Sequence, residues 1–370
     1  MKTHKLFWLT GSSFFDVDEP IVPKLSQLFD IHWFVIVQSD SFYKSSEIKK
    51  KLYDKDIKGT VVDWPRLRSL KSLWYFLNLS VQIKKGNYDL IYIDYLGLPY
   101  MFPMFYLFGL HRKKLIYACH DFVDHVAINN RGFITRYKHF IFKQFPYFQL
   151  FSKTQLQIFS KKFGKKTYFA PLALKGFGEP TSVKKDNKKI VFLFFGRIQE
   201  RKGLEYLIKA ANIVYEKCSG KFVIKICGES DNWKQYESLI KYPCCFDLAI
   251  RRIENEEIPN IFASSDFLVL PYKDVTQSGP LLISYNYNLP VIASNHPGFA
   301  EYISQGKTGF LFNICDENSL ASIMIDIVEG KYNLEMIIKN LNIFIKENVA
   351  LDSIVKKYDA GFKMILEDDV

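Results

Sequence analysis

The clearest strand-to-helix transition in the sequence lies in residues 190–217, IVFLFFGRIQERKGLEYLIKAANIVYEK. The six apolar residues Ile190–Phe195 predict a buried strand, and the apolar positions of Leu204–Lys217 recur with the spacing of an amphipathic helix. Short apolar runs alternate with helical stretches along the rest of the chain in the same way. This alternation predicts an α/β protein in which parallel sheets are covered by helices.

Two successive series of such units are expected. The first has predicted strands at Lys5–Thr10, His32–Val37, Thr60–Asp63, Leu90–Asp94, Lys114–Ala118 and Phe148–Ser152, with helices at Pro20–Phe29, Leu67–Lys84 and Phe133–Phe145. The second has predicted strands at Ile190–Phe195, Phe222–Cys227, Phe246–Ala249, Phe267–Leu270, Val291–Ala293 and Gly309–Phe312. Glycine, proline and lysine dominate the stretch between them, which is typical of a linker. We therefore predict a first domain of residues 1–175, a linker of 176–189 and a second domain of 190–350.

Positive charge is concentrated in the first half of the chain. The 370 residues carry a net charge of +11, but residues 1–180 hold 27 Lys and Arg against 14 Asp and Glu, whereas residues 181–370 hold 23 against 25. A basic half is suited to nucleic acid, an anionic membrane or a phosphorylated substrate. The apolar stretch Leu70–Leu77 favours a membrane over nucleic acid. The alternative is an ordinary solvated basic face.

The sequence also bears on location and on metals. The apolar run Leu6–Leu9 is too short for a secretory signal, and Tyr95–Leu110 is too short and too interrupted to span a bilayer. The six cysteines show no metal-ligand spacing. We expect a cytoplasmic protein without a metal.

The first candidate binding motif is Gly196–Gly203, between the predicted strand and helix of residues 190–217. Ligands bind at the carboxyl ends of parallel strands, where helix N-termini offer backbone donors. Arg197 and Lys202 would add two cations suited to a pyrophosphate. The alternative is a basic turn that only caps the helix.

A second candidate lies in Lys273–Pro280, after the predicted strand Phe267–Leu270. Its small polar residues are Thr276, Gln277, Ser278 and Gly279. Ser278 or Gly279 as cap and Pro280 in the first turn predict a helix start, whose amides would hold the other side of the same phosphates. Asn288 would end that helix in a left-handed conformation. The alternative is a well-capped turn without a ligand.

The first half offers two weaker candidates at strand ends. His120 and Asp121 follow the strand Lys114–Ala118, where the histidine would donate to a sugar hydroxyl or phosphate. Gly11 and Ser12 follow the first strand and would approach a ligand through their backbone donors. A hydrogen-bonded structural histidine is the alternative to the first.

Taken together, these motifs resemble the GT-B-fold glycosyltransferases, and most closely the retaining family 4. The resembling segments are Gly196-Arg197 with Lys202-Gly203, Ile224–Gly228, Glu257–Asp266, Leu270–Tyr272, Pro290–Ser294 and Gly306–Phe310, with Cys119–Asp121, Phe148–Phe163 and Leu351–Tyr358 as weaker matches. The resemblance implies two Rossmann-like domains, an acceptor-binding first one and a nucleotide-sugar-binding second one. It further implies that the final helix, within 351–370, packs back on the first domain.

The resemblance also assigns roles. Arg197 and Lys202 would hold the donor diphosphate, so that no metal is required, and Arg252 and Ile253 would lie in the loop that binds the base. His120 would contact the transferred sugar, and the reaction would retain the anomeric configuration. The acceptor would be a glycan or a lipid-linked molecule in polysaccharide or glycoconjugate synthesis. The basic residues 1–180 would contact the inner face of the membrane, through Arg66–Lys85 and Arg131–Lys143; the alternative for these two stretches is that their apolar faces belong to the core.

The sequence departs from that family at two positions. Val275 and Ile283 stand where the family usually carries two glutamates that bind the sugar and the ribose. Aliphatic side chains cannot accept hydroxyl hydrogen bonds. Two other readings therefore remain: an inactive homologue that binds nucleotide or a partner protein, and a nucleotide-sugar epimerase.

Overall fold

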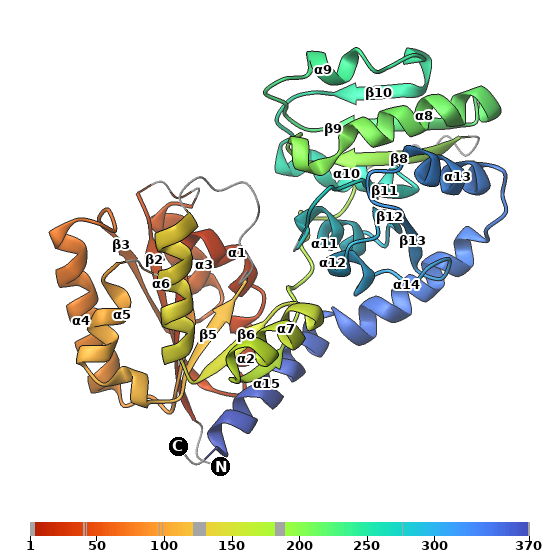
Figure 1. The fold of residues 1–370 in the computed structure, drawn as a ribbon. Helices are drawn as coiled ribbons and strands as arrows, with labels where there is room; N and C mark the ends of the chain where they lie inside the picture. Colours follow the sequence, from red (N-terminus) through yellow and green to blue (C-terminus); the bar gives the residue numbers. More distant parts are fainter. Residues whose placement is uncertain are drawn as a thin grey trace. The chain divides into compact units, whose positions relative to one another are not determined.

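The computed structural model describes residues 4–39, 41, 43–95, 97, 99–120, 131–181, 189–275 and 277–368. The chain divides into two units, residues 1–173 together with 351–370, and residues 174–350. Each unit contains one parallel sheet with helices on both faces (Figure 1). The predicted α/β class is therefore confirmed.

The sheet of the first unit has seven strands in the order β3-β2-β1-β4-β5-β6-β7. Their bounds are β1 Lys5–Gly11, β2 Asp30–Val37, β3 Gly59–Asp63, β4 Leu90–Asp94, β5 Leu115–Cys119, β6 Tyr147–Leu150 and β7 Lys166–Phe169. Six of these were predicted. The seventh, β7, is an edge strand of four residues with a single buried side chain, so it lacks the apolar run that marks the others.

Two helical layers cover this sheet. The first layer contains α1 (Phe15–Asp18), α2 (Val22–Leu25), α3 (Ser45–Asp54) and α15 (Leu351–Leu366), and its apolar core includes Trp8, Trp33 and Tyr358. The second layer contains α4 (Leu70–Gly86), α5 (Met101–Leu107), α6 (Arg131–Gln144) and α7 (Lys153–Phe163), and the apolar core beneath it includes Phe7, Phe76 and Phe148. Alternate residues of β1 thus feed two separate cores, as the pleat of a strand requires.

The predicted helix Pro20–Phe29 was wrong in extent, because only Val22–Leu25 is α-helical. The Ser26 hydroxyl donates to the carbonyl of Pro23 at 2.8 Å. Side-chain bonds of this kind compete with the backbone hydrogen bonds that would extend a helix. The segment therefore continues as turns.

The C-terminal helix α15 completes the core of the N-terminal unit. Tyr358 and Phe362 are fully buried against Trp8 and Tyr92 of the sheet. At Gly361 the helix approaches so closely that an added Cβ would lie 2.6 Å from the Tyr168 ring. Segments at the two ends of the chain are thus parts of one core.

The sheet of the second unit has six strands in the order β10-β9-β8-β11-β12-β13. They are β8 Ile190–Phe195, β9 Phe222–Cys227, β10 Phe246–Ala249, β11 Phe267–Leu270, β12 Val291–Ser294 and β13 Gly309–Phe312, all of them predicted. The helices are α8 Leu204–Cys218, α9 Lys234–Glu237, α10 Ile258–Ala263, α11 Gly279–Asn286, α12 Pro297–Ala300, α13 Glu317–Val328 and α14 Leu334–Asn348. No helix among the described residues of either unit is long and apolar enough to cross a membrane.

Strand order reverses once in each sheet, between β1 and β4 and between β8 and β11. At such a reversal the loops leave in opposite directions and open a space at the carboxyl ends of the strands. In the first unit, this point brings together Gly11 and Asp94, which end β1 and β4. In the second unit, it brings together Gly196 and Pro271, which directly follow β8 and β11.

Candidate functional site

Three glycines shape the turn that follows β8. Gly196 has φ +102° and Gly203 has φ +61°, both in the region that favours glycine. A Cβ on Gly203 would lie 2.0 Å from the carbonyl oxygen of Pro271, and one on Gly228 would lie 2.2 Å from that of Gly196. The turn is therefore held tightly against the ends of the neighbouring strands. It continues through the 3-10 helix η3 (Glu200–Lys202) into α8.

Lys202 is the main electrostatic feature of this turn. Only 8% of the residue is exposed, and its Nζ lies 5.7 Å from the centre of the Tyr272 ring. It forms no hydrogen bond or ion pair with any side chain in the described part of the chain. Burial, and secondarily the charge of Arg201, lower the pKa of Lys202 to about 8. A buried cation without a partner is costly, and an anionic ligand would remove that cost.

The N-terminus of α11 lies beside this lysine. Ser278 caps the helix by accepting from the backbone N–H of Leu281, and Asn288 has φ +54° just after the helix, as predicted for both. A Cβ on Gly196 would lie 3.0 Å from Lys202 Nζ and 3.8 Å from Pro280. The turn, the lysine and the start of α11 therefore converge on one small space, which combines an ammonium with the positive end of a helix dipole.

Arg197 has a partner, unlike Lys202. Its guanidinium lies 2.9 Å from Oδ2 of Asp231, and both side chains are more than half exposed. An exposed ion pair of this kind contributes little to stability, about 0–1 kcal/mol, so a phosphate could compete for the guanidinium. Its role in donor binding stays a prediction.

The other predicted donor residues are spread over several loops. Arg252 is exposed with Nε 3.7 Å from Glu254, and Ile253 is half-buried after β10. Gln277 is half-buried and Gly279 is exposed at the start of α11. Two predicted residues, Asp121 and Thr276, lie outside the described residues.

The two positions that depart from the family pattern are both buried. Val275 is 7% exposed and Ile283 is 6% exposed. Neither offers a hydrogen-bond acceptor on its side chain. Hydroxyl groups of a bound sugar would have to bond to other groups in this part of the unit.

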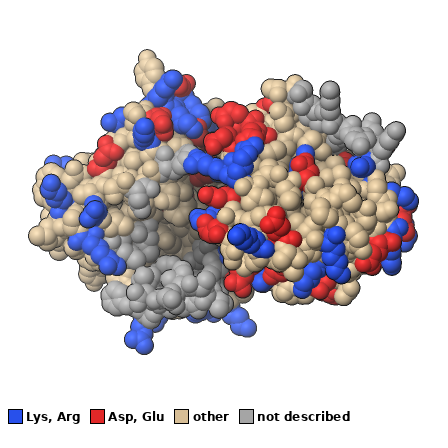
Figure 2. Space-filling model, turned by 90° about the horizontal axis from the view of Figure 1, so that it is seen from above, with Lys and Arg blue, Asp and Glu red and all other residues tan. Residues whose placement is uncertain are grey.

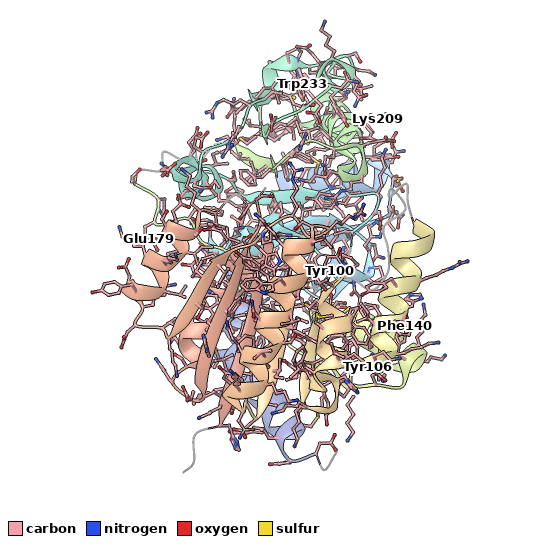
Figure 3. All side chains as sticks on the ribbon, turned by 90° about the vertical axis from the view of Figure 1, so that its left-hand side faces the viewer. Tyr100, Tyr106, Phe140, Glu179, Lys209 and Trp233 are labelled. Carbon is pink, nitrogen blue, oxygen red and sulfur yellow. The ribbon has the colours of Figure 1, made fainter. Side chains whose placement is uncertain are left out.

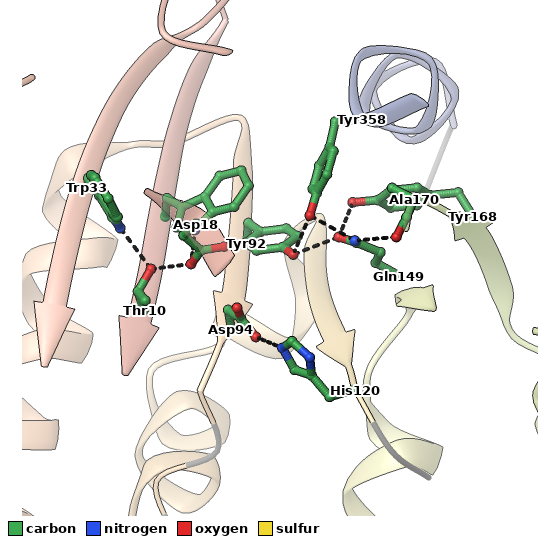
Figure 4. Close-up of polar contacts among 11 residues, drawn as sticks. Thr10, Asp18, Trp33, Tyr92, Asp94, His120, Gln149, Tyr168, Ala170 and Tyr358 are labelled. Atoms are coloured by element: carbon green, nitrogen blue, oxygen red, sulfur yellow. Dashed lines mark hydrogen bonds and ion pairs between the residues drawn. The ribbon is translucent and has the colours of Figure 1, made fainter. Parts of the chain in front are cut away.

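In the first unit, the predicted residue His120 lies between two aromatic rings and beside a carboxylate. Phe14 and Phe151 stack on the imidazole with ring centres 4.2 and 4.1 Å away. Nε2 lies 2.6 Å from Oδ1 of Asp94, whose side chain is completely buried (Figure 4). The rings fix the plane of the imidazole, and the carboxylate fixes its rotation.

A second buried carboxyl group lies close to Asp94. Asp18 accepts from the indole N–H of Trp8 at 2.8 Å and from the hydroxyl of Thr10, which itself accepts from Trp33 (Figure 4). Burial, and then the negative charge of Asp94, raise the pKa of Asp18 well above its usual value. Folding therefore favours the protonated form of Asp18.

The sequence did not reveal Asp94 and Asp18 as neighbours of His120. Asp94 ends a predicted strand, and that strand lies at the reversal of strand order. Its place at the carboxyl end of such a strand is a signal from which it could have been predicted as a site residue. Gly11 and Ser12 also lie at that reversal. A Cβ on Gly11 would lie 2.4 Å from the Tyr95 ring, and the buried Ser12 hydroxyl accepts from the backbone of Gln38 at 3.3 Å. The close packing against Tyr95 explains why a glycine stands at position 11. The contact of Gly11 and Ser12 with a ligand stays a prediction.

Replacing Asp18 with asparagine should flatten the dependence of thermal stability on pH. Because the pKa of Asp18 is raised on folding, the folded chain binds more protons than the unfolded chain above pH 3.8, and stability falls as pH rises through that window. Asparagine does not titrate. Melting temperatures measured from pH 4 to 8 should fall less in Asp18→Asn than in the parent. The matched control is Asp54→Asn on the exposed surface of α3, and an equal fall in both variants would contradict the assignment.

Comparison with known proteins identifies the family of the second unit. Residues 189–330 match the family described as Glycosyl transferases group 1. The chain is 26% identical over 275 residues to a 41.2 kDa protein in the cps region of Klebsiella pneumoniae, which covers 70% of this chain and 74% of that protein. It is 25% identical over 189 residues to a glycosyltransferase of Methanocaldococcus jannaschii, covering 49% of this chain and about half, 46%, of that protein.

The fold of the whole chain is also matched. The Anabaena protein HepE in complex with UDP superposes with a TM-score of 0.72 and 16% identity, covering 98% of this chain and all of that one. HepE has also been solved with UDP-glucose. The arrangement of two parallel sheets is therefore the GT-B fold predicted from the sequence.

Proposed function

We propose that this chain, a group 1 glycosyltransferase with the GT-B fold, transfers a sugar from a UDP-sugar to a glycan or lipid-linked acceptor. The acceptor would lie at the inner face of a membrane, and the product would be a polysaccharide or another glycoconjugate. The relative from a cps region supports the pathway, and the UDP complexes of HepE support the nucleotide.

One observation carries the proposal: the buried ammonium of Lys202, which has no hydrogen-bond or ionic partner among the described residues, lies beside the glycine turn and the start of α11. A diphosphate at this place would receive the lysine charge and the dipole of α11. The leaving nucleotide gains negative charge in the transition state, and fixed positive groups lower the barrier to its departure. Since an ammonium and a helix dipole neutralise the phosphates, we propose that no metal is needed here.

His120 would contact the transferred sugar from the first unit. Its imidazole is fixed by the two stacked rings and by Asp94, so a hydroxyl could be held without further ordering of the side chain. Retention of the anomeric configuration belongs to the same proposal, and it can be read from the anomer of the product.

Donor binding can be tested with thermal shift measurements using UDP-, GDP- and ADP-sugars side by side. A ligand at 100 times its Kd stabilises the folded protein by about 2.7 kcal/mol, so the melting temperature of the second unit should rise by several degrees with UDP-sugars. GDP- and ADP-sugars should have smaller effects. Equal shifts with all three would contradict selection for uridine, and no shift with any of them would contradict the proposed site.

A second candidate function is a nucleotide-binding homologue without transfer activity, and the buried Val275 and Ile283 favour it. It predicts the same thermal shift but no release of UDP across a panel of acceptors. A nucleotide-sugar epimerase instead predicts conversion of the donor in the absence of any acceptor. Release of UDP that depends on an acceptor supports the transferase against both.

A further inference from the structure

One helical layer of the first unit carries no acidic residue. The helices α4, α5, α6 and α7 contain ten Lys and Arg and no Asp or Glu. The helices α1, α2, α3 and α15, on the other face of the same sheet, contain seven Lys and Arg and six Asp and Glu. The positive charge of the first unit is therefore concentrated on one face, which we call the basic layer (α4–α7).

Five cations of the basic layer are exposed and lack acidic partners in the part of the chain that the structure describes. Lys71, Lys84, Lys85, Arg136 and Lys143 are exposed and form no ion pair with a carboxylate among the described residues. The opposite layer differs, because one lysine on each of its helices α3 and α15 is paired with a carboxylate, Lys51 with Glu19 and Lys363 with Asp359. On the second unit, acidic and basic side chains are interspersed over the face drawn in Figure 2. The basic layer is thus left to attract an anion.

Large apolar side chains are exposed on the same layer. Among the described residues of the first unit, ten large apolar side chains are exposed, and seven of them belong to this layer, namely Leu70, Trp74, Leu77, Tyr106, Leu107, Phe140 and Ile158. Leu70, Trp74 and Leu77 are spaced four and three residues apart, so they form one stripe along the outer side of α4. Trp74 is 62% exposed and Leu107 is 71% exposed.

A groove opens between α5 and α6 in this layer. Its volume is about 560 Å³, and it is lined by Phe102, Pro103, Met104, Tyr106, Leu107, Tyr137, Phe140 and Gln144. Tyr106 and Phe140 lie next to each other there (Figure 3). Lys143 lies one turn from Phe140 on α6, so the apolar lining has a cation beside it. The volume and the mostly apolar lining of this groove suit a hydrocarbon chain.

We infer that the basic layer (α4–α7) docks on the surface of an anionic lipid bilayer, with the α4 stripe and the α5–α6 groove inserted among the acyl chains. Electrostatic attraction to an anionic leaflet stabilises the bound state of the lysines. Exposed aromatic and aliphatic side chains stabilise it further, because they leave water for the bilayer. A nucleic acid would satisfy the cations and leave the apolar stripe and groove in water. The inference deepens the proposed function, on which it rests for the membrane-borne acceptor.

Vesicle binding by the full chain tests the electrostatic part. The protein should sediment with vesicles of phosphatidylcholine containing 30% phosphatidylglycerol, hardly with phosphatidylcholine alone, and less as salt is raised. K84A/K85A should lower the partition coefficient at least tenfold. K49A/K50A removes two adjacent exposed lysines from α3 of the opposite layer and should change it less than twofold. Equal losses in the two double variants would overturn the assignment to this layer.

Insertion is tested through Trp74. Trp8, Trp33 and Trp64 are buried, whereas Trp74 is exposed on α4. Bilayers containing brominated acyl chains should quench the parent fluorescence, and Trp74→Phe should remove most of that quenching. Leu107→Ser should weaken vesicle binding several-fold, whereas Tyr53→Ser, at a still more exposed position on α3, should not. Vesicle binding without quenching would overturn insertion. A polyanion site would be favoured instead if heparin and vesicle binding had the same salt dependence and Leu107→Ser changed neither of them.

The docking surface and the donor site can be tested independently of each other. K84A/K85A and Leu107→Ser lie outside the second unit and should keep the thermal shift with UDP-sugars. Loss of vesicle binding with an intact thermal shift supports the docking surface. An intact thermal shift in a parent chain that never binds anionic vesicles would overturn the surface while leaving the donor site standing.

Discussion

Replacing Lys202 with methionine should lower kcat/KM for sugar transfer by roughly 100- to 1000-fold. Methionine is of similar length and apolar, so it fills the buried space beside Tyr272 but supplies no charge to the donor phosphates. The folded state loses a buried cation that has no hydrogen-bond or ionic partner among the described residues and that only lies over the Tyr272 ring. The melting temperature without ligand should therefore stay unchanged or rise, while the shift with UDP-sugar disappears.

The pH dependence of donor binding provides the control. Since the pKa of Lys202 in the free protein is lowered to about 8, affinity for UDP-sugar should fall as pH rises above 8 and the ammonium loses its proton. Lys202→Arg keeps its charge at every accessible pH, so whatever affinity it retains should not fall between pH 8 and 9.5. Exposed Lys209 on α8 gives a matched change, Lys209→Met, that should leave both kcat/KM and the pH profile as they are. A parent profile that stays flat to pH 9.5 would contradict the role of Lys202.

Replacing Asp94 with asparagine should lower kcat about 100-fold, within the range for loss of a positioned proton-bearing group, and should leave the UDP-sugar Kd within twofold. Asparagine removes the charge that orients His120. It also removes the negative charge that helps to raise the pKa of Asp18, so the fall of stability with rising pH should become smaller. His120→Ala should reduce kcat by at least as much.

A structural role alone would give a different pattern. If Asp94 serves only the packing of the first unit, activity should fall in proportion to stability. In the double variant Asp94→Asn with His120→Ala, the asparagine should add little to the loss caused by the alanine, because Asp94 acts through the imidazole. If the losses of activity caused by the two substitutions instead multiply in the double variant, Asp94 does not act through His120.

The sequence predicted what depends on local pattern. Buried parallel strands such as Ile190–Phe195 are short apolar runs, and the bounds of six of the twelve predicted strands agree with the structure at both ends. The cap Ser278 and the left-handed Asn288 follow from the chemistry of single residues. Lys202 was selected because a basic residue follows a strand and precedes a helix.

The remainder depends on contacts between distant residues. Asp94 and His120 are 26 positions apart, and Arg197 and Asp231 are 34 apart. These separations match neither the period of a helix nor that of a strand, so the sequence pattern alone does not indicate the contacts. The burial of Lys202 likewise comes from Tyr272, on another strand end. Charge counts found the basic half, but only the sheet topology separates its acid-free helices from those on the other face.

The position of α15 has a consequence for how this protein is made. The Tyr358 hydroxyl accepts from Gln149 at 2.8 Å, and Gln149 in turn accepts from Tyr92, so the last helix closes a polar network in the middle of the first sheet (Figure 4). A ribosome releases these residues only after the whole second unit has been made. The second unit, residues 174–350, is complete before that moment and can fold while the first still lacks its final helix. A nascent chain that still lacks residues 351–370 would therefore expose Trp8 and Tyr92 to chaperones and proteases, and a nonsense codon just before α15 would destabilise the unit that was translated first.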